Sequence, residues 1–320
     1  MGKKIRIWLI VAVSLLLVGG IVFTVAMSSL GWDFVKLSTT KHKTTTHTVA
    51  EDFDGISIYA GEADIRLSLA EDGGCRVECF EKESATHTVM VEDGKLMITT
   101  VDNSKWYENF FDFVDETITV YLPQREYALL SIENRTGDVE VPKDFSFESA
   151  QVSTSTGDIR WFASASGEVT LKATTGDISV ENISVSSLKL SVSTGQVHAM
   201  GVNCTDGVSV QVSTGEAYLT DIACKSFTSN GDTGDITLKN VQATERLSIE
   251  RSTGDVDFDG CDGGEIIVKT GTGDIEGTLL SGKIFSVSTS TGHVSVPQSS
   301  SGGKCTLKTT TGDIHVRVLE

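Results

Sequence analysis

The residues best placed to do chemistry are the polar residues that follow the glycine in ten copies of one phrase, Thr-Gly-Asp. That residue is Asp in seven copies and Glu in one, and the exceptions are Gln196 and His293. The glycines are Gly137, Gly157, Gly176, Gly195, Gly215, Gly234, Gly254, Gly273, Gly292 and Gly312. Carboxylates stacked at the spacing of β-strands, about 4.8 Å, would repel one another or share cations.

A calcium ladder is one interpretation of these carboxylates. Calcium-binding β-rolls, however, use a nine-residue repeat with paired glycines, and this sequence has neither feature. The alternative is that each Asp caps its turn by accepting hydrogen bonds from nearby backbone N–H groups. We favour turn capping and therefore predict no metal site and no cofactor.

Histidine and cysteine give little support for catalysis. The six histidines are His42, His47, His87, His198, His293 and His315. None lies in a nucleophile elbow, a His-Glu-x-x-His motif or a phosphate-binding loop. A row of carboxylates is also found in enzymes that act on polysaccharides, but here the row falls in the turn of the repeat. We therefore predict that the chain is not an enzyme.

The six cysteines are Cys75, Cys79, Cys204, Cys224, Cys261 and Cys305, without Cys-x-x-Cys spacing. Cys204 and Cys224 both lie nine residues after a repeat glycine, so stacked coils would place their Cα atoms about 5 Å apart. Two outcomes are open: a disulfide between neighbouring coils, or stacked buried thiols. We favour free thiols, because parallel side chains on adjacent strands strain the S–S dihedral angle.

The spacing of the phrase specifies the elements that carry it. The nine steps between successive glycines are 20, 19, 19, 20, 19, 20, 19, 19 and 20 residues. Around Gly176, apolar residues alternate with polar ones, as in Val169, Leu171 and Ala173 before it and Ile178 and Val180 after it. Alternation indicates strands with one buried face. A strict period indicates a repeat architecture. We predict an all-β, single-stranded β-solenoid of about ten coils.

Within a coil, the glycine is expected at a sharp turn, where it can adopt positive φ without steric cost. The preceding threonines should form a ladder along one edge. The alternation of 19 and 20 residues suggests one optional residue at a second corner, for which the candidates are Asn182, Gly201, Asp221, Asn240 and Gly260.

Strands without the strict repeat precede the solenoid and are predicted to form an N-terminal β cap over residues 51–125. The predicted strands are Ile56–Tyr59, Ala63–Leu69, Arg76–Phe80, Thr88–Val91, Leu96–Thr100 and Thr117–Leu122. Asp93-Gly94 is typical of a hairpin turn. Residues 61–65 read as a decayed copy of the repeat. Repeat arrays need atypical ends, which favours a capping role.

One aromatic segment interrupts this region. Five of the nine residues from Trp106 to Val114 are aromatic: Trp106, Tyr107, Phe110, Phe111 and Phe113. The segment could cover the end of the solenoid, or it could contact a partner protein or the membrane surface.

The N-terminus has the features of a membrane anchor. Residues 5–27 are apolar apart from Arg6 and are long enough to cross a hydrocarbon core of about 30 Å. The preceding basic residues predict a cytoplasmic N-terminus. The competing interpretation is a cleavable signal peptide, but Thr24-Val25-Ala26 is a poor cleavage site. The predicted division is a cytoplasmic tail at 1–4, an anchor at 5–27, a linker at 28–50, the cap at 51–125 and the solenoid at 126–320.

The charge limits the partners. The chain has 26 basic and 44 acidic residues and a net charge of −18. Such a surface repels nucleic acid, which we exclude as a partner. It tolerates basic partners, although its simplest role is to keep a strand-rich rod soluble.

The repeats resemble a bacterial family of domains of unknown function whose members are called putative adhesins. The resemblance is carried by Ser155–Ile159, Arg251–Val256 and Thr310–Ile314, and by the entry phrase Asp52–Ile58. It implies a β-helical envelope protein and brings no catalytic residues. We therefore expect a single-pass protein of the cell membrane whose external solenoid acts as a surface scaffold or adhesin. The alternatives are an accessory of an envelope-stress system that docks a partner membrane protein, and a polysaccharide-active enzyme.

Overall fold

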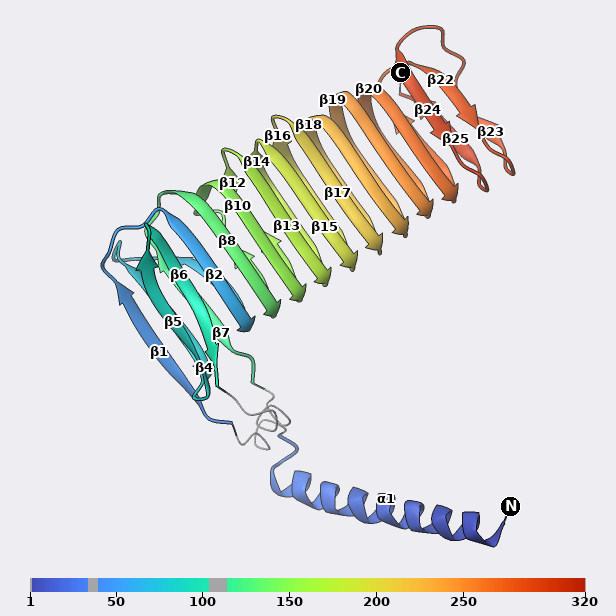
Figure 1. The fold of residues 1–320 in the computed structure, drawn as a ribbon. Helices are drawn as coiled ribbons and strands as arrows, with labels where there is room; N and C mark the ends of the chain where they lie inside the picture. Colours follow the sequence, from blue (N-terminus) through green and yellow to red (C-terminus); the bar gives the residue numbers. More distant parts are fainter. Residues whose placement is uncertain (1, 34–39, 104–113, 320) are drawn as a thin grey trace.

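The computed structural model describes residues 2–33, 40–103 and 114–319. They form one helix, α1 (Lys3–Ser29), followed by strands and turns, so the predicted all-β solenoid with one N-terminal apolar helix is confirmed. Figure 1 shows the strands stacked side by side along one rod. Helix α1 contains a segment, Ile5–Ser29, long and apolar enough to span a membrane.

The strands fall into three groups along the chain. The N-terminal group is β1 (His42–Val49), β2 (Gly55–Glu62), β3 (Asp64–Leu69), β4 (Cys75–Lys82), β5 (Ala85–Glu92), β6 (Lys95–Asp102) and β7 (Thr117–Leu122). The middle group is β8 (Glu126–Thr136), β9 (Val139–Val141), β10 (Ser146–Thr156), β11 (Ile159–Trp161), β12 (Ser164–Ala165), β13 (Glu168–Thr175), β14 (Ile178–Val185), β15 (Ser187–Thr194), β16 (Val197–Cys204), β17 (Gly207–Thr214), β18 (Ala217–Thr233), β19 (Ile236–Thr253) and β20 (Val256–Thr272). The C-terminal group is β21 (Ile275–Leu279), β22 (Lys283–Ser288), β23 (Val294–Ser295), β24 (Gly303–Lys308) and β25 (Ile314–Val318).

Each coil contributes one strand before the repeat glycine and one strand after it. The strands pair in parallel with the same strand of the next coil, in a register that stacks the repeat threonines: Thr156 pairs with Thr136 on one side and with Thr175 on the other. The inward side chains, such as Val169, Leu188 and Val208, form apolar ladders along the interior of the solenoid. The threonine ladder expected from the sequence is therefore present.

The repeat glycines occupy a corner that has no room for a side chain. All ten have φ between +123° and +149°. A Cβ added to any of them would lie 1.8 to 2.3 Å from a backbone oxygen of the neighbouring coil. The requirement for glycine therefore comes from the close approach of two coils as well as from the backbone conformation.

A second corner lies six residues after the repeat glycine. Asn182, Gly201, Asp221, Asn240 and Gly260 all have φ between +50° and +67°, so this corner is present in every one of these coils. The optional residue predicted here lies elsewhere: Cys224 pairs with Ala243, but Ser226 pairs with Arg246. The extra residue of that 20-residue coil is thus inserted just beyond Ala243, at the next bend.

The spatial order of the coils departs from the sequence order at the C-terminal end. Strand β24 pairs with β20 on one side and with β22 on the other, and β25 lies in the same way between β21 and β23. The last segment of the chain is therefore inserted between two earlier coils, and β22 and β23 form the outer edge (Figure 1).

The N-terminal end is rearranged in the same sense. Strand β2 pairs in parallel with β6 and with β8, and β3 pairs with β7 and with β9, so the coil pattern continues N-terminal to residue 126. Antiparallel strands then complete this end: β5 on β6, β4 on β7, and β1 on β4. Residues 42–49, part of the stretch expected to be a linker, are therefore a strand. The six strands predicted for this region are all present.

Candidate functional site

The Thr-Gly-Asp phrase is absent from the N-terminal end of the solenoid, which precedes residue 126. In the neighbouring coil, Ala63-Asp64 occupies the corner, and Asp64 Oδ1 accepts a hydrogen bond from Asp138 N at 2.9 Å. Residues 61–65 therefore make the same hydrogen bond between coils as the copies of the repeat. In the next coil outward, β6 ends at Asp102 and β7 begins at Thr117, and the chain between them has no Thr-Gly-Asp phrase.

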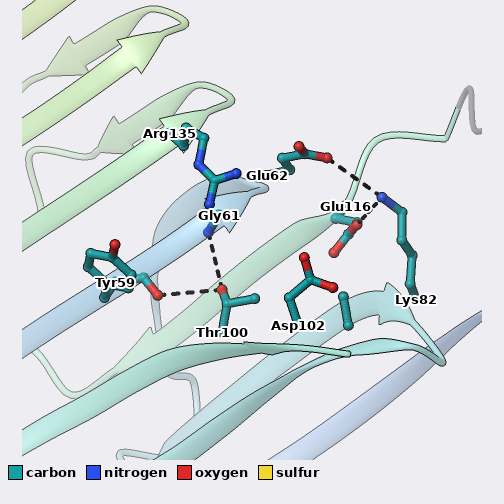
Figure 2. A pocket seen from close by; sticks show the side chains of 9 residues that line it. Tyr59, Gly61, Glu62, Lys82, Thr100, Asp102, Glu116 and Arg135 are labelled. Atoms are coloured by element: carbon teal, nitrogen blue, oxygen red, sulfur yellow. Dashed lines mark hydrogen bonds and ion pairs between the residues drawn. The ribbon is translucent and has the colours of Figure 1, made fainter. Parts of the chain in front are cut away.

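A pocket of about 90 Å³ lies where β6 ends and β7 begins (Figure 2). Its lining residues are Tyr59, Gly61, Glu62, Lys82, Ala85, Thr100, Asp102, Glu116 and Arg135. They come from the ends of β2, β4, β6 and β8, the first residue of β5, and the residue before β7. A small-molecule site usually encloses at least about 300 Å³. The pocket therefore suits a single side chain or small polar group, not a drug-sized ligand.

A buried ion pair crosses the pocket. Lys82 Nζ lies 3.0 Å from Glu116 Oε1 and 3.7 Å from Glu62 Oε2. The side chains of Lys82 and Glu116 are only 8% and 6% exposed, whereas Glu62 is half-exposed. Burial raises the pKa of Glu116, and the hydrogen bond from Lys82 offsets this in part. The three pocket carboxylates outnumber its two cationic side chains, so the pocket favours a positively charged group.

A second buried polar group lies beside the pocket residues. Glu81 accepts hydrogen bonds from Thr45 Oγ1 and from His87 N, both at 2.6 Å, and lies 3.0 Å from His87 Nδ1. Burial would raise the pKa of Glu81, but these hydrogen bonds outweigh it and lower the pKa. Cys79 lies two residues earlier on the same strand and is fully buried. These are the residues of the described chain whose grouping could hold a metal ion.

The carboxylates of the repeat form hydrogen bonds between neighbouring coils. From coil to coil, an Asp Oδ1 accepts a hydrogen bond of 2.7 to 2.9 Å from the backbone N–H of the residue after the glycine in a neighbouring coil. The Asp side chains therefore accept hydrogen bonds from backbone N–H groups, as expected, but the N–H belongs to a neighbouring coil, so each Asp links two coils and does not cap its own turn. Gln196 and Glu216 instead bond to each other through their side chains.

The aromatic residues proposed as a partner contact lie outside the described residues. Trp106, Tyr107, Phe110, Phe111 and Phe113 fall within 104–113, so that prediction stays a prediction. The sequence reasoning did not identify Glu81, Lys82 or Glu116, because a strand ending at Phe80 places none of them inside. A signal existed: Glu81 continues the alternation of Cys75, Val77 and Cys79, all of which face inward.

The described cysteines are all free and buried. Cys204 Sγ donates to the backbone oxygens of Ser186 at 3.0 Å and of Gly207 at 3.3 Å. Burial raises the pKa of Cys224 to about 12. A thiol in this setting is unreactive unless the coil opens.

Comparison with known proteins gives a family and a set of distant structures. The family model Toastrack DUF4097 matches residues 53–216 and again residues 203–320. No curated protein shows significant similarity to the chain.

Three solved structures illustrate the distant similarity. A putative adhesin from Bacteroides fragilis is 15% identical, with a TM-score of 0.43 over 88% of this chain and 99% of its own. One from Parabacteroides distasonis is 12% identical, with a TM-score of 0.49 over 85% and 98%. A third, from Parabacteroides merdae, is 11% identical, with a TM-score of 0.41 over 88% and 97%.

Proposed function

The chain belongs to the Toastrack DUF4097 family, and from this premise we propose that it is a membrane-anchored surface scaffold of the adhesin type, without enzymatic activity. In this proposal, α1 crosses the membrane with its N-terminus in the cytoplasm. The solenoid stands outside the cell and presents a long, acidic, repetitive surface to a basic ligand or partner.

The observation that carries the proposal is the continuity of the parallel strand pairing from coil to coil. Parallel pairing runs through the middle of the rod from β2 and β3 to β20 and β21, and each coil pairs mainly with its two neighbours. Stacked coils of this kind form a stiff body whose length depends on the number of coils, at about 4.8 Å each. A stiff rod joined to a membrane helix is well suited to hold a surface at a distance from the cell.

The length of α1 supports the anchor. Its 27 residues correspond to about 40 Å of helix, which exceeds a hydrocarbon core of about 30 Å. A signal sequence passes the same test of length and composition, so the retention of the helix is part of the proposal.

A deletion of two whole coils tests the scaffold. Removal of residues 177–215 joins Gly176 to Glu216 and restores the Thr-Gly-acid phrase, so the shortened rod is expected to fold. We expect cells that display the full chain to adhere better to a polycation-coated surface than cells without it, and the shortened chain to retain this adhesion. Equal adhesion with and without the chain would contradict the proposal.

One observation favours a second candidate, an accessory that docks a partner membrane protein. Only residues 30–41 separate α1 from β1, and a chain of that length reaches at most about 40 Å. Since β1 pairs with β4, which carries Lys82, the pocket would stay near the membrane. The C-terminal strands lie at the far end of the rod (Figure 1).

Photo-crosslinking separates the two candidates. A photoreactive amino acid in place of Tyr59, which lines the pocket and is 53% exposed, is expected to give a discrete adduct with a membrane protein if the pocket docks one. The matched control is the same substitution at Tyr218, which is 38% exposed on the middle coils. Equal adduct patterns at both positions would eliminate docking at the pocket.

A further inference from the structure

Three side chains with metal-binding chemistry meet inside the N-terminal end, apart from the pocket of Figure 2. Cys79 and Glu81 lie on β4, and His87 lies on β5. Their exposed fractions are 0%, 1% and 5%, and one candidate ligand atom from each lies within 4.8 Å of the other two. Elsewhere in this end of the rod, inward positions carry residues such as Val77, Ile98 and Ile118.

The orientation of His87 is a second, independent observation. Its Nδ1 is held 3.0 Å from Glu81 Oε2, while its Nε2 is buried and has no hydrogen-bond partner. Buried polar atoms are nearly always paired, and an orphan costs about 1–3 kcal/mol. Nε2 lies on the other side of the ring from the Glu81 contact, so an ion shared with Glu81 would bind Nδ1 in place of this hydrogen bond. The unpaired Nε2 shows that the surrounding side chains do not satisfy the ring by themselves.

The supporting contacts fix the carboxylate as well. Thr45 on β1 donates to Glu81 Oε1, and Lys43 Nζ lies 3.9 Å from the same oxygen. The cluster thus joins three strands, β1, β4 and β5, that together complete the N-terminal end. The described residues provide no hydrogen bond for the thiol of Cys79.

The donor set selects the class of ion. A thiolate, an imidazole and a carboxylate are the ligands of Zn²⁺ and similar divalent transition ions. Calcium, in contrast, takes six to eight oxygen ligands. We propose that Cys79, Glu81 and His87 bind one zinc-class ion, which links β4 to β5 and stabilises the membrane-proximal end of the rod. The Asp row of the repeat does not take part.

Metal content is the direct test. The full-length chain, purified in detergent and stripped with a chelator, is dialysed against Zn²⁺ and analysed for bound metal, and then loaded with Co²⁺ for absorption spectroscopy. We expect one ion per chain, a thiolate-to-cobalt charge-transfer band and a higher melting temperature with Zn²⁺. Calcium should leave the melting temperature unchanged.

Two variants distinguish a metal site from a merely polar core. Cys79→Val should lose the charge-transfer band and weaken Zn²⁺ binding about tenfold or more, the loss typical of disturbed metal sites. Cys305→Val, also at a fully buried cysteine but far from the cluster, should keep both. If Cys79→Val does not fold, the metal content and melting temperature of the unmodified chain with Zn²⁺ still test the proposal. No retained metal and no change in melting temperature would overturn the proposal.

Discussion

The N-terminal end and the middle coils continue the same pattern of parallel strands but differ in the residues that are buried inside. In the middle coils, from β8 to β20, a Thr-Gly corner closes a core built mainly of Val, Leu and Ile ladders, in which Arg251 is the buried charged side chain. The N-terminal end lacks the Thr-Gly phrase, and four acidic or basic side chains are buried there: Glu81, Lys82, His87 and Glu116. The glycine corner of a regular coil has no room for a side chain that could bind a ligand. The buried polar cluster lies instead where the repeat phrase is absent.

The largest expected effect comes from breaking the corner of a middle coil. In Gly215→Ala, the new Cβ would lie 1.8 Å from the backbone oxygen of Gly195, so the two coils must separate. We expect a loss of at least about 4 kcal/mol, seen as a lower melting temperature by circular dichroism. Gly260→Asn is the matched control, because Asn182 and Asn240 occupy the same corner with similar φ. Similar losses of stability in both variants would show that the positive φ, and not the close approach of the two coils, determines the requirement for glycine.

The next effect probes the buried ion pair of the N-terminal end. Lys82→Met leaves Glu116 buried without its partner at 3.0 Å, and we expect a loss of about 3 kcal/mol. The double variant Lys82→Met/Glu116→Gln should recover most of it. Lys189→Met removes an exposed pair with Glu168 on the middle coils and should cost less than about 0.5 kcal/mol. Equal costs for Lys82→Met and Lys189→Met would remove the contrast between the two regions.

The smallest effect is a pH dependence specific to the N-terminal end. Because the pKa of Glu116 in the folded chain is raised, the stability it contributes is present at low pH and is lost as pH rises through that pKa. Glu116→Gln should therefore gain stability relative to the unmodified chain between pH 4 and pH 7. Melting temperatures at the two pH values measure this gain. A difference that is constant with pH would show that burial does not control this carboxyl.

The strands of the repeat could be predicted from the sequence, but the spatial order of the strands at the two ends of the solenoid could not. The period, the alternation around Gly176 and the Asp93-Gly94 turn predict the strands, because these signals are local. The spatial order of the ends is not local. Coils with the same phrase offer the same register to one another. The local sequence of residues 303–318 therefore does not specify that β24 inserts between β20 and β22, or that β25 inserts between β21 and β23.

The polar cluster escaped prediction for a related reason. A charged residue in an alternating strand is normally read as facing solvent, and Glu81 is identified as internal only by its partners. Those partners come from separate strands: Thr45 lies 36 residues away on β1, and His87 lies six residues away on β5. The antiparallel pairing of β1 with β4 brings Thr45 to Glu81, and β5 reaches this place through its own pairing with β6.

The insertion of terminal segments at both ends has a physical advantage. An edge strand has unpaired backbone groups and frays or recruits other strands. Strand β24 is hydrogen-bonded to a neighbouring strand on each side, β20 and β22. At the other end, β2 is likewise paired on both sides, with β6 and β8. The outer edges are instead formed by segments that are covalently continued in both directions.

The most direct test of the account asks on which side of the membrane the rod lies. Since the described cysteines are all buried, a membrane-impermeant maleimide should label intact cells only through an introduced cysteine. We predict labelling of Ser300→Cys in intact cells, and labelling of Gly2→Cys only after permeabilisation, which also requires that the helix is retained. Labelling of Ser300→Cys only after permeabilisation would place the rod inside the cell and contradict the account.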